Sequence, residues 1–286
     1  MVEGEKMTDV ELVFPRDEQE LFEQLDENAI ILNGGTDIIV RNRVRGLSAT
    51  KLVSLDQLTQ MDQIIDEGNA IRIFARATYS QILSNEMVVR EFPILHKTLS
   101  EIGSTQIRNR GTITGNIVNA SPAGDAVLAM YLLDALLVIR SAGSEKTVRI
   151  DNFIKGPGKT TLEKGEYIHS ILIPKCPHNC VHYFKKVGQR KAMAISIASM
   201  GAIYTLKKDM FLNLKIAFGS VAPTVIRADE IEAMALGMSF TEQTAQVLAQ
   251  KAKAIVKPIT EVRASGDYRR EVSGNLVIGM FEKNEI

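Results

Sequence analysis

The chain has 286 residues with 34 basic and 34 acidic side chains, so its formal net charge is zero, and 45% of its residues are hydrophobic. This length predicts about two domains with buried cores, and a charge-balanced chain without a concentrated basic surface is not expected to bind nucleic acid. The polar N-terminus lacks the apolar core of a signal peptide, and no apolar run approaches the roughly 20 residues that span a membrane, so we expect a cytoplasmic protein without membrane contact.

The first part of the chain alternates short helices and strands. Asp17–Glu27 has apolar residues at helical spacing, and either Thr36 or Asp37 can cap another helix. Pro93 can interrupt one of the later helices, because proline lacks a backbone N–H. The apolar patterns predict strands at Ala29–Leu32, Lys51–Leu55, Ala70–Ala75 and Ala135–Arg140, and further helices at Tyr79–Ser84, Met87–Ile102 and Asp125–Asp134. The stretch Glu166–Ile173 closes this α+β half.

A linker is predicted near residue 176, because Pro174 and Pro177 resist regular structure. A three-stranded antiparallel sheet with helices on one face is the natural packing for the elements that follow. The predicted fold class is therefore α+β, with domains at 1–175 and 176–286. The elements predicted after the linker are strands at Val181–Val187, Ser196–Leu206 and Leu212–Phe218, and helices at Arg227–Leu236, Glu242–Val256 and Asp267–Phe281.

The only cysteines, Cys176 and Cys180, exclude a disulfide framework and a four-cysteine iron–sulfur cluster held by this chain alone. With His178 and His182 they form an alternating Cys/His run that resembles a zinc site. In a strand these side chains would spread over about 20 Å, whereas zinc needs its donors within about 2.3 Å of one ion. We therefore interpret the run as part of the linker and predict no metal site.

The stretch Asn33-Gly34-Gly35-Thr36-Asp37 lies between a predicted strand and a predicted helix. Glycines leave the main chain uncovered and a helix N-terminus carries about half a positive charge, so a pyrophosphate would fit there. A bare strand-to-helix turn explains the same pattern. The chain has neither G-x-G-x-x-G nor G-x-x-x-x-G-K-[ST], which disfavours a nicotinamide Rossmann domain.

A second glycine-rich stretch, Gly111–Asp125, crowds threonine, asparagine and serine side chains around its glycines. Pro122 and Gly124 oppose regular structure there. Asp125 opens a predicted helix, where it could serve as an N-cap or accept hydrogen bonds from ribose hydroxyls. A structural loop buried between domains is the alternative interpretation of the whole stretch.

Gln106–Arg110 followed by Gly111–Asp125 resembles the signature of the FAD-binding (medium) subunits of molybdenum hydroxylases, the flavoproteins of the xanthine dehydrogenase and carbon monoxide dehydrogenase type. Three later motifs, Tyr183–Arg190, Val221–Ala228 and Ser265–Arg270, fall in the expected order. Thr36-Asp37 in place of His-Ser makes the chain more similar to the xanthine dehydrogenase side, whereas Thr114 stands where the family usually has glycine.

The resemblance implies a vanillyl-alcohol-oxidase-type (PCMH-type) FAD-binding domain at 1–175, made of two α+β subdomains divided near residue 55, and a smaller α+β flavoprotein domain at 176–286. By resemblance, Asp125 holds the ribose or adenine side of FAD, Ile102 and Ile168 lie near the flavin, and Lys185 lies near the isoalloxazine. The implied cofactor-binding residues are Ile31, Leu32, Asn33, Gly34, Gly35, Thr36, Asp37, Ile38, Ile102, Thr112, Thr114, Gly115, Asn116, Asp125, Ile168 and Lys185.

The implied function is the FAD subunit of a multi-subunit, xanthine dehydrogenase-like molybdenum hydroxylase. Substrate would be hydroxylated at a molybdopterin cofactor on a large partner subunit, and electrons would pass through [2Fe–2S] clusters of a small partner subunit to this FAD. NAD or another acceptor would then be reduced, with no catalytic side chain needed on this chain because the flavin carries the chemistry. A stand-alone flavin-binding or assembly protein without turnover, and a stand-alone flavin oxidase, are the alternatives.

Overall fold

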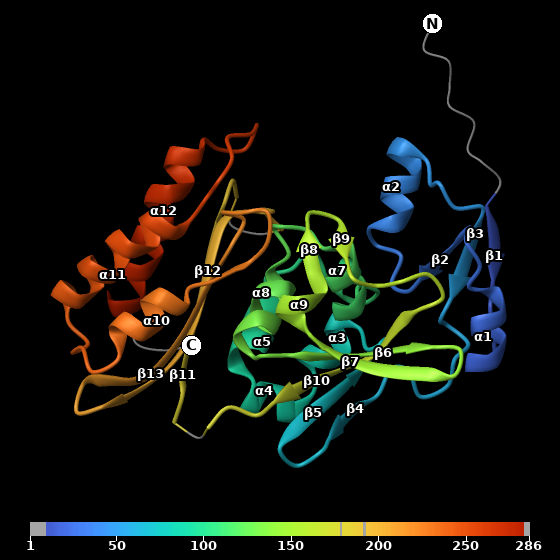
Figure 1. The fold of residues 1–286 in the computed structure, drawn as a ribbon, viewed down its shortest axis with the longest axis horizontal. Coiled ribbons are helices and arrows are strands. Elements are labelled where there is room, and N and C mark those ends of the chain that lie inside the picture. The colour runs from blue at the N-terminus through green and yellow to red at the C-terminus, as the bar shows by residue number, and fades with distance from the viewer. Residues whose placement is uncertain (1–9, 178, 191–192, 283–286) are drawn as a thin grey trace, which may run out of the picture.

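The computed structural model describes residues 10–177, 179–190 and 193–282. Three sheets lie side by side in this part of the chain, with helices between the second and third and outside the third (Figure 1). The α+β fold class predicted from the sequence is confirmed. The limits of the two domains, and the subdomain division near residue 55, stay predictions.

The N-terminal sheet has three parallel strands in the order β1-β3-β2. Helix α1 is shorter than the predicted Asp17–Glu27, because Asp17 is its N-cap and Leu25 leaves the helical region of φ and ψ. Leu21 of α1 is fully buried and packs with Val53 in a small core. The elements of this unit are β1 Glu11–Val13, α1 Glu18–Gln24, β2 Ala29–Leu32, α2 Ile38–Arg45 and β3 Lys51–Ser54.

The central sheet has five antiparallel strands in the order β4-β5-β10-β6-β7. Its strands are β4 Ile64–Asp66, β5 Ala70–Phe74, β6 Leu136–Ser141, β7 Ser144–Arg149 and β10 Tyr167–Pro174, and a separate hairpin joins β8 Ile154–Gly156 to β9 Lys159–Thr160. The helices of this unit are α3 Tyr79–Leu83, α4 Glu86–Glu91, α5 Pro93–Ser100, α6 Thr105–Arg108, α7 Ile113–Asn119, α8 Asp125–Leu132 and α9 Ile150–Phe153.

Two local features of this unit test the sequence predictions. Pro93 does interrupt the helix expected at Met87–Ile102, since Phe92 leaves the helical region and Pro93 begins α5. The second glycine-rich stretch was expected to be irregular, but it contains helix α7, which Ala120 ends in a left-handed conformation. The proline and glycine that opposed regular structure lie beyond that end.

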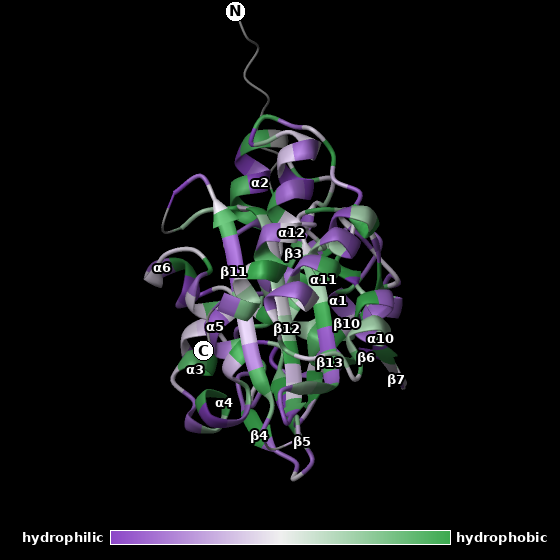
Figure 2. Cartoon of the chain, turned by 90° about the vertical axis from the view of Figure 1, so that its left-hand side faces the viewer, coloured by the Kyte–Doolittle hydropathy of each residue, from purple (hydrophilic) through white to green (hydrophobic). Residues whose placement is uncertain are grey.

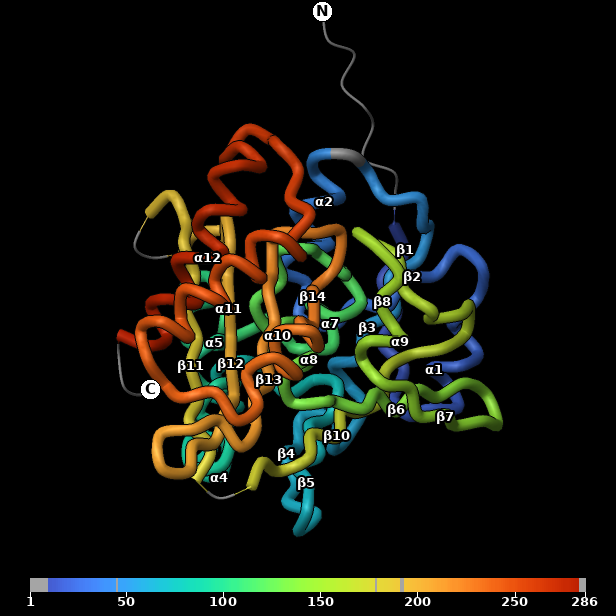
Figure 3. The backbone as a smooth tube through the Cα atoms, turned by 60° about the vertical axis from the view of Figure 1, so that its left-hand side comes forward, coloured from blue at the N-terminus to red at the C-terminus, as the bar shows by residue number. Residues whose placement is uncertain are grey.

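The C-terminal sheet is antiparallel with the order β11-β12-β13-β14. The prediction of three strands was wrong, because Ile226 and Arg227 pair with Phe218 and Ala217 as a short fourth strand. Helices α10–α12 cover one face of the sheet and α5 and α8 lie behind the other (Figures 2 and 3). The elements are β11 Val181–Gly188, β12 Ser196–Lys207, β13 Met210–Gly219, β14 Ile226–Arg227, α10 Asp229–Ala235, α11 Glu242–Ile255 and α12 Gly266–Glu282.

The C-terminal sheet and the central unit share one apolar core. Phe184 of β11, Ile203 of β12 and Ala217 of β13 belong to the same buried cluster as α8. Every residue of α8 is buried, because the helix lies between the central helices and the C-terminal sheet. The C-terminal half, which comprises β11 to α12, is therefore packed directly against α8, the helix that begins at the end of the second glycine-rich stretch.

His182 is buried on β11 and gives a testable pH dependence. It shares a strand face with Phe184, and its Nδ1 atom has no hydrogen-bond partner among the residues that the structure describes. Burial lowers the pKa of His182 to about 4. The unfolded chain binds a proton near the ordinary pKa of about 6.5, so folded-state stability is lost as the pH falls from that value toward 4.

We expect His182→Leu to reduce this acid sensitivity. Between pH 7 and pH 5, the loss of unfolding free energy should be about 2 kcal/mol smaller in the variant than in the unaltered chain. Urea unfolding at both pH values measures the difference. Equal losses in the two proteins would contradict a neutral buried imidazole at this position.

Candidate cofactor site

A cavity of about 650 Å³ lies between the N-terminal sheet and the central unit. Much of its lining comes from three segments, which are the loop from β2 to α2, helix α7 with the residue before it, and the turn that leads into β10. The two glycine-rich stretches thus face the same space, although about eighty residues separate them in the sequence.

Gly34 brings the two stretches into backbone contact. A Cβ atom at this position would overlap the carbonyl oxygen of Arg110, and would lie 2.9 Å from the carbonyl carbon of Arg110 and 3.0 Å from the Cα of Gly111. Gly35 adopts a φ of +74°, the left-handed region that side chains disfavour. Gly34 therefore allows the backbones of the two stretches to approach closely, and Gly35 allows the turn between β2 and α2.

Asn33 and Thr114 tie the two stretches to the end of β5. The Nδ2 atom of Asn33 donates to the Ala75 carbonyl at 2.7 Å and to the Thr114 hydroxyl at 3.0 Å. The Thr114 hydroxyl in turn donates to the same Ala75 carbonyl at 2.7 Å. Thr114, which replaces the usual glycine of the motif, thus has a structural partner for its hydroxyl while still lining the cavity.

Helix α7 presents its N-terminal end to the cavity. Thr112 caps the helix by accepting a hydrogen bond from the Gly115 N–H at 3.2 Å, and the Oδ1 atom of Asn116 is buried without a hydrogen-bond partner in the described part of the chain. The first residue of α2, Ile38, also lines the cavity. Helix N-termini carry partial positive charge, so this end of the cavity favours an anionic group.

Apolar and aromatic side chains line other parts of the cavity. Ile31, Ile102 and Ile168 contribute aliphatic surface, and burial raises the pKa of Tyr79, which keeps its hydroxyl neutral. Such a combination of an anion-attracting end and apolar walls suits a ligand that carries both a phosphate and a flat aromatic ring.

A partly buried contact joins α1 to the central sheet beside the cavity. The Tyr167 hydroxyl donates to Glu18, and Arg140 donates to the same carboxylate at 3.0 Å. Glu18 belongs to α1, whereas Arg140 and Tyr167 belong to β6 and β10. Since Tyr167 also lines the cavity, these polar contacts connect one of its walls to the N-terminal unit.

Comparison with known proteins identifies the family that shares this arrangement. Residues 8–176 match the family described as the FAD-binding domain in molybdopterin dehydrogenase, and residues 182–283 match the CO dehydrogenase flavoprotein C-terminal domain. The chain belongs to this molybdopterin dehydrogenase flavoprotein family. The family resemblance inferred from the motifs is thereby confirmed.

Several members resemble the chain over nearly its full length. The glyceraldehyde dehydrogenase medium chain of Sulfolobus acidocaldarius is 31% identical, covering 90% of this chain and 91% of the relative. The xanthine dehydrogenase FAD-binding subunit of Escherichia coli O157:H7 is also 31% identical, covering 84% and 83%. A solved structure of the carbon monoxide dehydrogenase from Hydrogenophaga pseudoflava, which lacks the Mo-pyranopterin moiety, is 27% identical with a TM-score of 0.89, covering 94% of this chain and 95% of that chain.

Most of the residues assigned to the flavoprotein site by resemblance surround the cavity. Ile102 and Ile168, which no local pattern singled out, are among them. The predicted residues that line it are Ile31, Asn33, Gly34, Gly35, Thr36, Asp37, Ile38, Ile102, Thr112, Thr114, Gly115, Asn116 and Ile168. Their contacts with a cofactor stay a prediction.

Leu32, Asp125 and Lys185 are not among the residues that line the cavity, and their contacts with a cofactor stay a prediction. Asp125 is the first residue of α8 rather than its N-cap, and both of its carboxylate oxygens are bonded to protein side chains. Lys185 is exposed because the alternation of β11 points it away from the central unit.

Sequence reasoning missed other lining residues. Val118 and Asn119 belong to the unexpected helix α7, and the turn 162–166 precedes β10. Gly165, with its φ of +76°, was the available signal for that turn. Ile195 reaches the cavity from the C-terminal half, and no local pattern distinguishes it from other exposed isoleucines.

The Cys/His run does not form a metal-binding group in the described residues, where no set of three or more His, Cys, Asp or Glu side chains is placed to hold an ion. Burial raises the pKa of Cys176 to about 11, which opposes the thiolate form that binds zinc. His178 lies outside the described residues. No helix in the described ranges has the length and apolar character needed to cross a membrane.

Proposed function

We propose that this chain is the FAD-binding medium subunit of a multi-subunit, xanthine dehydrogenase-like molybdenum hydroxylase. The observation that carries the proposal is the cavity built on Gly34 and Gly115, in a chain that belongs to the molybdopterin dehydrogenase flavoproteins. Its relatives are named as medium chains or FAD-binding subunits. Its identity with the xanthine dehydrogenase subunit, 31%, exceeds its identity with the carbon monoxide dehydrogenase structure, 27%.

The residues of the cavity fit FAD. The uncovered backbone at Gly34 and Gly35 and the N-terminal end of α7 would hold the diphosphate. The buried Oδ1 of Asn116 is an acceptor without a partner in the described residues, and the hydroxyls of FAD are donors. Ile102 and Ile168 would pack against the flavin ring. Bound FAD supplies the electron-transfer chemistry, and the chain supplies binding, position and exclusion of water.

The proposed partners follow from what this chain lacks. Two cysteines cannot ligate two [2Fe–2S] clusters, which require four ligands each. The clusters would therefore belong to a small partner subunit, and the molybdopterin cofactor to a large one. NAD or another small acceptor would take electrons from the flavin. The cytoplasmic location expected from the sequence stays a prediction.

The direct test is to purify the complex that forms around the tagged chain and to identify its cofactors. We expect one FAD per chain, released by denaturation and identified by chromatography, together with molybdenum and iron in the co-purifying subunits. FAD added to the isolated chain should also be retained. A complex that contains no flavin, and a chain that takes up none, would refute the proposal.

A further inference from the structure

The buried carboxylate of Asp125 is held entirely by the C-terminal half of the chain. Lys186 of β11 donates from Nζ to Oδ2 of Asp125 at 2.8 Å, and the hydroxyl of Ser196 at the start of β12 donates to Oδ1 at 2.7 Å. The side chains of Lys186 and Asp125 are only 10% and 6% exposed. Asp125 is the last residue of the second glycine-rich stretch, which borders the cavity. Its bonds to Lys186 and Ser196 therefore fix one end of that stretch.

The same residues also contact the other walls of the cavity. Lys186 donates to the carbonyl of Glu101 at 2.8 Å, and the residue after Glu101, Ile102, lines the cavity. Ser196 directly follows Ile195, the lining residue that the C-terminal half supplies. One buried group of three side chains therefore connects the second stretch, Ile102 and Ile195.

A second bond holds the same stretch from the C-terminal half. The N–H of Ser220, after β13, donates to the Pro122 carbonyl at 2.9 Å. Buried Arg269 of α12 donates to the carbonyls of Ser220 at 2.8 Å and Ile197 at 2.7 Å. The guanidinium of Arg269 therefore connects the start of β12 to the end of β13, the two strand ends that contact the second glycine-rich stretch.

We propose that Asp125, Lys186 and Ser196 form a positioning clamp, through which the C-terminal half sets the geometry of the second glycine-rich stretch and so controls flavin affinity. The clamp rests on the proposed function, because Lys186 and Ser196 act on the FAD site through Asp125 and do not themselves line the cavity. Without the Lys186 cation, the buried carboxylate of Asp125 would be an unpaired charge, which strongly destabilises its present position. The second glycine-rich stretch would then shift, and FAD binding would weaken although no residue that lines the cavity has been replaced.

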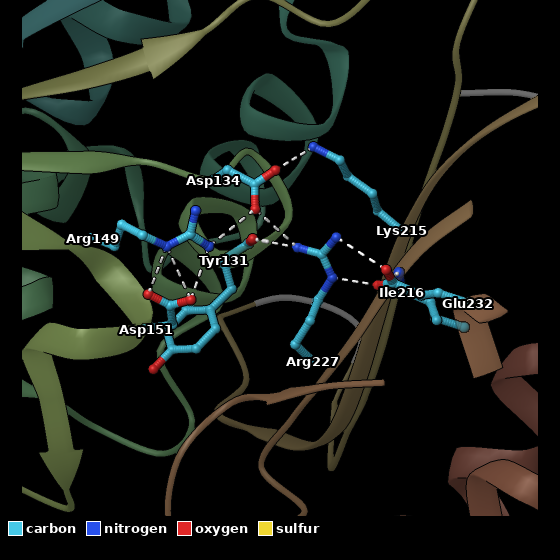
Figure 4. A network of polar contacts seen from close by, with 8 residues as sticks. All are labelled: Tyr131, Asp134, Arg149, Asp151, Lys215, Ile216, Arg227 and Glu232. Atoms are coloured by element: carbon cyan, nitrogen blue, oxygen red, sulfur yellow. Dashed lines mark hydrogen bonds and ion pairs between the residues drawn. The ribbon is translucent and has the colours of Figure 1, made fainter. Parts of the chain in front are cut away.

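Another polar network joins the same two halves at a different place. Asp134, just beyond the far end of α8, pairs with Lys215 of β13 and with Arg227 of β14 (Figure 4). None of these three residues lines the cavity, and their ion pairs with one another lie outside the second glycine-rich stretch. Replacement of Lys215 therefore serves as a control, because it weakens the contact between the two halves without changing the clamp.

The test compares FAD binding by full-length Lys186→Met, Lys186→Arg, Lys207→Met and Lys215→Met. We expect Lys186→Met to raise the FAD dissociation constant by about 10- to 100-fold and to alter the visible absorption spectrum of the bound flavin. Lys186→Arg keeps a cation beside Asp125 and should recover most of the affinity. Lys207→Met, at the exposed end of β12, should bind FAD as the unaltered chain does.

Lys215→Met separates positioning from stability, since it should lower the melting temperature while leaving the FAD dissociation constant unchanged. Equal weakening by Lys215→Met and Lys186→Met would overturn the clamp, as would a folded Lys186→Met with unaltered affinity and spectrum. If Lys186→Met does not fold, Ser196→Ala removes one bond to Asp125 and should still weaken FAD binding several-fold, and unaltered binding there would overturn the proposal. An unaltered chain that binds no FAD would instead refute the proposed function.

Discussion

Replacing Gly34 with alanine should weaken FAD binding by about 100-fold. The added methyl group would overlap the carbonyl oxygen of Arg110 and press on the backbone of Gly111, and backbone atoms cannot move aside as a flexible side chain can. The two glycine-rich stretches would have to separate, and a displacement of about 1 Å at a binding constellation costs on the order of 100-fold. Titration of the purified chain with FAD, followed by quenching of flavin fluorescence, measures the loss.

Gly156→Ala is the matched control for this prediction. Gly156 lies in β8, and a methyl group there would meet no atom within 4 Å. The control should keep the FAD affinity and the melting temperature of the unaltered chain. Circular dichroism of Gly34→Ala must show a folded protein for the comparison to hold, and a folded Gly34→Ala with undiminished affinity would disprove the close approach of the two stretches as the basis of the site.

Most helices and strands could be predicted because their patterns are local. Pro93 interrupts a helix by removing its own N–H, which is an effect that sequence alone carries. Helix α7 could not be foreseen in the same way, since it combines glycine with the β-branched residues Ile113 and Ile117. Those isoleucines are buried in the central core, and tertiary packing of this kind overrides weak helix propensity.

The candidate site shows where local information ends. Lys185 and Lys186 are chemically identical neighbours, and the sequence does not show which of them faces inward. Burial of Phe184 against the central unit sets the phase of β11, so Lys186 reaches Asp125 and Lys185 points to solvent. The partners of Asp125 lie 61 and 71 residues further along the chain, a separation at which no spacing rule identifies a contact.

Strand β14 illustrates the same limit at a smaller scale. It consists of Ile226 and Arg227 alone, so its two residues give no alternating pattern that could be recognised. The helix predicted to begin at Arg227 begins instead at Asp229. Pairing with β13 places the Arg227 side chain between the two halves of the molecule, where it makes contacts that its sequence neighbours do not suggest.

Replacing Arg227 with alanine should destabilise the fold by about 3 kcal/mol. Its guanidinium donates to the Tyr131 carbonyl at 2.9 Å, to Asp134 at 3.2 Å and to both oxygens of Glu232 (Figure 4). The side chain of Glu232 is only 17% exposed, so removal of the arginine leaves a largely buried carboxylate without its cation. Urea unfolding should show a lower midpoint with an unchanged slope.

Arg149→Ala tests whether the loss of unfolding free energy depends on the burial of an ion pair or only on the presence of the pair. Arg149 lies in the same network and pairs with Asp151 at 2.9 Å, but these side chains are 50% and 42% exposed. Exposed pairs contribute about 1 kcal/mol or less, because water solvates the separated charges. Arg149→Ala should therefore lose far less stability than Arg227→Ala, and equal losses would contradict the assignment of Arg227 as the main polar connection at this end of α8.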